Sequence, residues 1–390
     1  MSFFELLKAE LRAIFSDKDI ILTIIGGVLL YSFLYPQPYL KESVTALSVV
    51  VIDEDKSDIS RKMVYMLDAS PQIEVESGYM SEYEAKEAII NNKISAMVII
   101  PKHYKRDLYL GKEPVISVGA DASYFLIYGG VVEGAMRSVF TQSATLQVGE
   151  LLKKSVPLIT AKQQYTPFKT NFINTFNISG SYINYVIPAV FVLILQQTML
   201  IGMAMLGAAQ LSQQRQGKHG YYNTQSVSAV MAARYLIFGF IFLVHMLFYF
   251  GFSFEFFGVP HIAKIGDLLL FGFSFITAVA ALGLFLGALF KERVYPTPII
   301  LLTSLPLVFS AGFIWPLEMM PEWIIILSQL SPSTPGIQGF LRLNQMGASF
   351  EQVIMQFGTL WIQTLLYASM AYFLLKRSRK AKDTMVKSTS

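Results

Sequence analysis

The stretch INYVIPAVFVLILQQTMLIGMAMLG at 183–207 contains no charged side chain. A helix needs about 20 apolar residues to cross the hydrocarbon core of a bilayer, so this stretch is long enough to span a membrane. Further apolar blocks lie at 20–35, 228–252, 266–290, 296–315 and 353–375. The sequence therefore predicts an α-helical membrane protein with six transmembrane helices.

Composition supports this class. Of the 390 residues, 53% are hydrophobic and only 15% are charged, and the mean hydropathy is +0.48. Soluble domains usually carry about 25% charged residues. A net charge of +4 gives no reason to expect a nucleic-acid partner. The absence of cysteine excludes disulfides, a thiol nucleophile and a cysteine-ligated metal.

The N-terminal part predicts an amphipathic helix followed by a retained anchor. Residues 1–18 read as a helix in the membrane interface, with Phe4, Leu7, Leu11 and Ile14 at helical spacing. An ordinary surface helix is the alternative. Transmembrane helix 1 is expected at 19–36, and not a signal peptide, because acidic residues precede it and no small-x-small cleavage site follows.

Residues 37–181 change in character and predict an inserted extracytoplasmic α/β domain. Short runs rich in β-branched residues predict strands at 46–53, 72–77, 95–100 and 115–119. Helical patterns alternate with them at 57–68, 81–92, 101–110 and 124–153. Such alternation is typical of a mostly parallel or mixed sheet covered by helices.

Residues 182–376 hold the predicted transmembrane helices 2–6. Between the last two lies a proline-rich segment with the apolar piece WIIILSQL at 323–330, which is too short to cross a bilayer. A re-entrant segment is therefore expected near 316–335, since irregular backbone at membrane depth must be buried in protein.

The distribution of basic residues predicts the orientation. One set of short segments carries almost all of them: Lys8, Arg12, Lys18, Arg215, Lys218, Arg234, Lys291, Arg293, Lys376, Arg377, Arg379, Lys380, Lys382 and Lys387. The opposite short segments hold only Lys264 and Arg342. By the positive-inside rule both termini, including the basic tail at 377–390, are cytoplasmic and the α/β domain lies outside.

Motifs for chemistry are missing from the sequence. It has no G-x-x-x-x-G-K-[ST], no H-E-x-x-H and no G-x-S-x-G, and its histidines show no metal-ligand spacing. The spans hold mild polar groups that could line a translocation path or only bond neighbouring helices: Gln196, Gln197, His245 and Thr303. We therefore expect no enzyme activity and no metal in this chain, and an energy source in a partner.

A G-x-x-x-G pattern formed by Gly283 and Gly287 permits close helix packing. The pattern alone does not say whether the packing is within the chain or across a dimer.

Several short strings resemble those of the type-2 ABC transporter permeases, which are exporter subunits with a large external domain between spans one and two. They are IPKHYKRDL at 100–108 with Gly111 and DAS at 121–123, YTP at 165–167 with IP at 187–188, and SAGFIWP at 310–316 with MP at 320–321 and LSP at 330–332. The likeness covers nearly the whole chain. It departs after span two, where the family often has Arg-Glu and Gly-Thr and this chain has RQGKHG at 215–220.

The resemblance implies a separate cytoplasmic ABC ATPase that holds ATP and Mg, so that this chain binds no cofactor itself. It implies coupling through Arg215, Gln216, Gly217, Lys218, His219, Gly220, Lys291 and Arg293. It also implies an outer gate in the segment that contains Gly312, Pro316, Pro321 and Pro332.

The resemblance further implies a multi-pass protein of the bacterial inner membrane, surrounded by membrane lipid. A second permease copy or a paralogue would complete the path, and a periplasmic adaptor is a further candidate partner. The alternative function is a membrane-anchored sensor whose outer α/β domain binds a ligand. Against it, no cytoplasmic segment is long enough to form an output domain.

Overall fold

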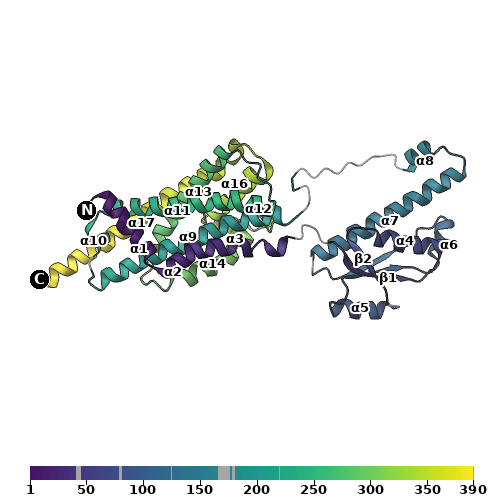
Figure 1. Ribbon diagram of the computed structural model, residues 1–390, viewed down its shortest axis with the longest axis horizontal. Coiled ribbons are helices and arrows are strands. Elements are labelled where there is room, and N and C mark those ends of the chain that lie inside the picture. The colour runs from purple at the N-terminus through teal and green to yellow at the C-terminus, as the bar shows by residue number, and fades with distance from the viewer. Residues whose placement is uncertain are drawn as a thin grey trace. The chain divides into compact units, whose positions relative to one another are not determined.

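The computed structural model describes residues 1–40, 45–78, 81–123, 125–165, 176–177, 181–218 and 220–389. The chain divides into two compact units (Figure 1). Met1–Glu42 and Asn174–Ser390 form the membrane unit, and Ser43–Ile173 forms the inserted unit. All strands that the structure describes lie in the inserted unit.

Within the described residues, five helical stretches are long and apolar enough to cross a membrane: Lys18–Tyr39, Ile183–Arg215, Val227–Phe257, Ile265–Leu289 and Phe350–Arg379. Their helices are α2 (Lys18–Ile21), α3 (Val28–Leu34), α9 (Ile183–Arg215), α11 (Val227–Leu247), α12 (Phe254–Phe257), α13 (Ile265–Leu289) and α17 (Ile354–Thr389). These five long apolar helices coincide with the blocks predicted as spans one to four and six. A separate helix, α1 (Phe3–Phe15), precedes them.

The block predicted to form a span at 296–315 is shorter in the structure. It forms α14 (Pro296–Ser310), with 15 residues, and falls among the shorter apolar helices. At 1.5 Å per residue this helix is about 22 Å long, against a hydrocarbon core of about 30 Å. The helix stops because Gly312 adopts a left-handed conformation with φ of 86°. The chain continues through α15 (Glu322–Ser328) and α16 (Ser333–Phe340) to α17.

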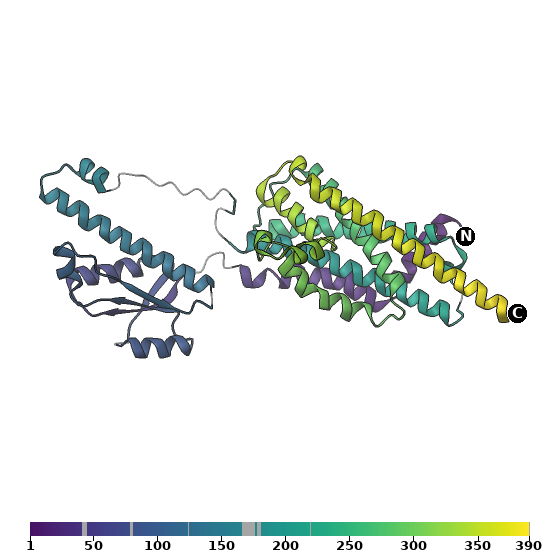
Figure 2. The same ribbon diagram turned by 180° about the vertical axis from the view of Figure 1, so that it is seen from behind.

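Helix α9 forms the centre of the membrane unit. Every residue in the most apolar 18-residue part of α9 is buried. The helix contacts α13, α14, α16, α11 and α3. Figure 2 shows the same bundle from behind, with the C-terminal α17 running along it. A helix that is apolar on every side is expected in the interior of a bundle, and the sequence of α9 has this character.

Glycines allow α9 and α13 to cross at close range. A Cβ atom on Gly207 would lie 2.8 Å from the Cα of Gly287, and one on Gly283 would lie 2.9 Å from the sulfur of Met203. The G-x-x-x-G pattern at 283–287 therefore packs within the chain against α9. This contact decides between the two interpretations that the sequence left open.

Substitution of Gly207 by alanine is expected to destabilise the membrane unit by about 1–2 kcal/mol, because the new methyl group meets backbone that cannot rotate away. Gly239, in α11, is the matched control, since a Cβ there would have no atom within 4 Å. Gly239→Ala should be neutral or stabilising by up to about 1 kcal/mol, as expected for the removal of a glycine from a helix. Thermal melting of both variants in detergent checks this, and equal melting temperatures would contradict it.

The inserted unit is built on a four-stranded mixed sheet, in the order β2 (Ile73–Glu76), β1 (Leu47–Asp53), β3 (Ala96–Ile100) and β4 (Ser117–Ala120). β1 pairs parallel with β2 and β3, and β3 pairs antiparallel with β4. The helices are α4 (Asp58–Asp68), α5 (Glu82–Ile90), α6 (Tyr104–Tyr109), α7 (Phe125–Lys153) and α8 (Leu158–Tyr165). The predicted mixed α/β region is thus confirmed.

Alternation along the strands gives this sheet two apolar faces. On β1, Val49 packs with α4 and α7, whereas Val50 and Ile52 pack with α5. A buried hydrogen bond also joins α7 to α6. The hydroxyl of Tyr104, in α6, donates to Oε1 of Gln142, in α7, at 2.8 Å. Burial raises the pKa of Tyr104 to about 12, so its hydroxyl remains a donor.

Candidate functional site

The loop that follows α9 makes a tight turn into a short helix, α10 (Tyr221–Thr224). Gly217 adopts a left-handed conformation with φ of 79°. The backbone N–H of Lys218 donates to the carbonyl oxygen of Gln213 at 3.0 Å. A left-handed glycine with this hydrogen bond is the Schellman ending of a helix, and it fixes the direction of the loop.

The turn holds most of the residues that the sequence assigns to the ATPase contact: Arg215, Gln216, Gly217, Lys218 and Gly220. His219 lies outside the described residues. The side chains of Arg215 and Lys218 are exposed. Their positive charges are therefore available to a partner that approaches this end of the bundle.

Behind the turn lies a buried polar cluster, which we define as Glu10, Gln210, Tyr221 and Arg234. Glu10 of α1 is 0% exposed and Arg234 of α11 is 4% exposed, and they form an ion pair. Arg234 also donates to Oε1 of Gln210 at 2.6 Å, and Gln210 donates through Nε2 to the Tyr221 hydroxyl at 2.7 Å. The Tyr221 hydroxyl donates to Glu10 in turn.

This cluster connects four helices, α1, α9, α10 and α11. Burial, and then the negative charge of Glu10, raises the pKa of Tyr221 well above its ordinary value. The phenol therefore stays protonated and donates to the carboxylate at physiological pH. The half-buried Tyr221 thus joins α10 to Glu10 of α1 and to Gln210 of α9, and Arg234 joins α11 to the same two residues.

The position of Glu10 explains how α1 packs. The buried residues of α1 are Leu6, Glu10 and Ile14, at a spacing of four, whereas Phe4 and Leu11 are exposed. Of the face predicted from Phe4, Leu7, Leu11 and Ile14, Ile14 is buried and Leu7 packs on the bundle, whereas the other two side chains point away from it. Its exposed apolar side chains remain available to lipid.

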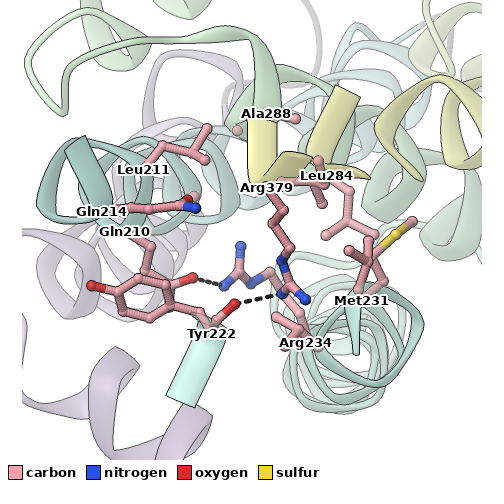
Figure 3. A pocket seen from close by; sticks show the side chains of 14 residues that line it. Gln210, Leu211, Gln214, Tyr222, Met231, Arg234, Leu284, Ala288 and Arg379 are labelled. Carbon is pink, nitrogen blue, oxygen red and sulfur yellow. Dashed lines mark hydrogen bonds between the residues drawn. The ribbon is translucent and has the colours of Figure 1, made fainter. Parts of the chain in front are cut away.

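Two further arginines tie this end of the bundle together. Arg293, in the loop between α13 and α14, pairs with Asp17 and Asp19 at 2.6 Å each. Arg379 of α17 donates to the carbonyl oxygen of Tyr222 in α10 (Figure 3) and to that of Gln225, the residue after α10. Lys291 is exposed. Arg293 therefore joins the α13–α14 loop to the start of span one, and Arg379 holds α10 against α17.

Among the described residues, no hydrogen bond joins the four polar residues predicted in the spans to one another. Gln196 is 0% exposed and donates to the hydroxyls of Ser331 and Ser333, at 2.9 and 3.2 Å. Thr303 bonds the carbonyl oxygen of Ile300 in its own helix. Within the described part of the chain, both amide atoms of Gln197 and Nδ1 of His245 are buried without a hydrogen-bond partner.

The proline-rich segment packs back into the bundle. Helix α16 is almost wholly buried and contacts α9, α13 and α17, whereas α15 exposes Trp323 and Ile326. Gly312 and Pro316 lie between α14 and α15, Pro321 is the cap before α15, and Pro332 is the cap before α16. The Gln196 hydrogen bonds join this segment to α9. Among the described residues no group of three or more His, Asp or Glu could hold a metal ion.

The sequence interpretation did not identify the buried cluster. Arg234 was grouped with the basic residues of the cytoplasmic side, and Glu10 entered only as an argument against a signal peptide. One signal was present, because Arg234 lies within an otherwise apolar block. A charged residue inside such a block needs a partner.

Comparisons with known proteins agree with this architecture. The family of ABC-2 transporter proteins matches residues 18–373. The inner membrane transport permease YhhJ of Escherichia coli (strain K12) is 22% identical over 387 residues, which cover 96% of each chain. YhhJ of Shigella flexneri shows the same identity and coverage. Because the family match extends from the first long apolar stretch into the last and includes the inserted unit, the chain belongs to the ABC-2 family of transporter proteins.

Proposed function

We propose that this chain is the membrane-spanning permease subunit of an ATP-driven exporter in the bacterial inner membrane. The observation that carries the proposal is the buried cluster of Glu10, Gln210, Tyr221 and Arg234 behind the exposed turn at the end of α9. A rigid connection from an exposed basic turn to the interior of a bundle is what a transmembrane subunit needs to receive force from a partner. A separate cytoplasmic ABC ATPase would supply that force, with ATP and Mg bound in it.

In this proposal the ATPase contacts Arg215, Lys218 and the neighbouring loops. ATP binding would favour one arrangement of α1 and α10, and hydrolysis would favour the other. Such coupling requires that the ATPase bind the two arrangements with different affinity. The family likeness supports a non-catalytic role for this chain, and direction as export rests on that likeness.

Charge distribution supports cytoplasmic termini and an external inserted unit. This orientation requires an even number of membrane crossings, so α14 would form the sixth crossing. The residues after Ser310 would span the part of the bilayer that α14 is too short to cross. Helix α16 and the turns before it would close the outer end of the path. A second copy or a paralogue would form the other half, and an adaptor protein would contact the external unit.

The test is the recovery of an ATPase with the tagged chain from native membranes. Arg215→Glu with Lys218→Glu reverses two exposed charges, and we expect recovery of the P-loop ATPase to fall about tenfold or more, because like charges then face each other at the contact. Lys264→Glu is the matched control, since it is exposed and lies on the opposite side of the membrane in the proposed orientation.

Mass spectrometry of the recovered complex gives the readout. Equal recovery from the double variant and the control would contradict the placement of the contact. If the unsubstituted chain purifies without any ATPase, the permease function itself is overturned, and the sensor function becomes the one to test.

A further inference from the structure

A narrow pocket lies between α9, α11, α13 and α17, beside α10 (Figure 3). Its polar lining consists of Gln210, Gln214, Tyr222, Arg234 and Arg379, and apolar residues form the rest. Figure 3 shows the side chains of Arg234 and Arg379 lying side by side, with Tyr222 on one side and Met231 on the other. Two guanidinium groups, from helices far apart in sequence, therefore meet in one space.

The charges in this pocket do not balance. Arg234 has Glu10 as its counter-ion, but none of the described side chains that line the pocket carries a carboxylate. Among the side chains that the structure describes, which on α17 end at Arg379, none with a carboxylate pairs with Arg379, whose contacts are backbone carbonyl oxygens. Carbonyl groups satisfy hydrogen-bond donors but do not neutralise a charge. A half-buried guanidinium beside a second one gains stability from an anion.

The pocket lies where two of the long apolar stretches end, and lipid headgroups are expected at the ends of such stretches. The apolar stretch of the last span ends at Arg379, and Gln214 lies in the last turn of α9. Half-buried apolar side chains from three helices also line it, namely Met231, Ala288 and Leu375. A ligand with an anionic head and an apolar tail would meet both kinds of surface.

We propose that this pocket binds the phosphate of an anionic membrane lipid, with Arg379 as the principal contact. Phosphate suits the planar donor fork of a guanidinium, and basic pockets between transmembrane helices favour anionic headgroups. A zwitterionic lipid is disfavoured, because no carboxylate among the described lining residues receives its cationic group. Because Arg379 also holds the backbone around α10, the bound lipid stabilises the junction of α17 and α10.

The experiment uses native mass spectrometry of the full chain, titrated separately with phosphatidylglycerol, phosphatidylcholine and inorganic phosphate. Phosphatidylglycerol should bind about tenfold more tightly than phosphatidylcholine, as expected for one uncompensated charge at the membrane surface. Arg379→Gln should remove this preference. Arg377→Gln on the same helix is the matched control, because Arg377 is exposed and does not line the pocket.

A second variant separates lipid binding from the role of Arg379 in holding α10. Gln214→Glu places a carboxylate in the lining and leaves Arg379 in place, so the preference for phosphatidylglycerol should again fall about tenfold. Equal lipid preference in the Arg379, Gln214 and Arg377 variants would overturn the proposal. Displacement of the lipid by equimolar inorganic phosphate would also overturn it, because the apolar contacts would then contribute nothing.

Discussion

Substitution of Glu10 by alanine is expected to lower the stability of the membrane unit by about 3–5 kcal/mol, the usual cost of removing one partner from a buried ion pair. Arg234 is only 4% exposed and would lose its counter-ion. Tyr221 would also lose its acceptor. The melting temperature in detergent measures the loss, and ATPase stimulation by the reconstituted chain should fall with it, because α1 is no longer joined to α10.

Two comparisons give this prediction its control. Glu5→Ala removes a carboxylate from the exposed face of the same helix, where it takes part in a capping box with Ser2, and should cost about 1 kcal/mol. Glu10→Met with Arg234→Met replaces the pair by apolar groups and should recover most of the stability but not the stimulation, since the link to Tyr221 is still absent. If the Glu10→Ala and Glu5→Ala variants melt at the same temperature, the cluster does not contribute the expected stability to the membrane unit.

The elements of both units could be predicted from sequence because their signals are local. An uncharged run such as 183–207 has few alternatives to a membrane span. The strands of the inserted unit, such as Ala96–Ile100, follow from short runs of apolar and β-branched residues between turn signals. The sequence does not predict that α14 ends early. The residues stay apolar as far as Trp315, but the backbone already turns at Gly312.

The contacts between elements could not be predicted, because they join residues that are far apart along the chain. Nothing near Glu10 indicates that its partner is Arg234, and an acidic residue on an amphipathic helix normally faces water. Similarly, Gly283 and Gly287 predict that another helix packs closely here. They do not indicate that the residues in contact are Met203 and Gly207 of α9. The sequence therefore predicts the basic turn as a candidate site, but it does not predict the buried cluster behind the turn.

Substitution of Gly339 by valine is expected to displace α16 from α13 and to cost about 3 kcal/mol, at the upper end for overpacking of a core. A Cβ on Gly339 would lie 2.0 Å from Cζ of Phe271 and within 2.7 Å of two other ring atoms. The ring cannot retreat, because Phe271 is fully buried and packs edge-on against Phe340. Of the two serines that bind Gln196, Ser333 is the first residue of α16 and Ser331 lies just before it, so this displacement should also break the connection to α9.

Gly358→Val on α17 is the matched control, because a Cβ there would have no atom within 4 Å. The rescue is Phe271→Ala combined with Gly339→Val. Phe271→Ala alone should cost about 3–5 kcal/mol through the cavity it leaves. In the double variant valine occupies part of that cavity. The loss of stability in the double variant should therefore be about 2 kcal/mol smaller than the sum of the losses in the two single variants. Strict additivity, or equal melting of Gly339→Val and Gly358→Val, would show that α16 is not held by this contact.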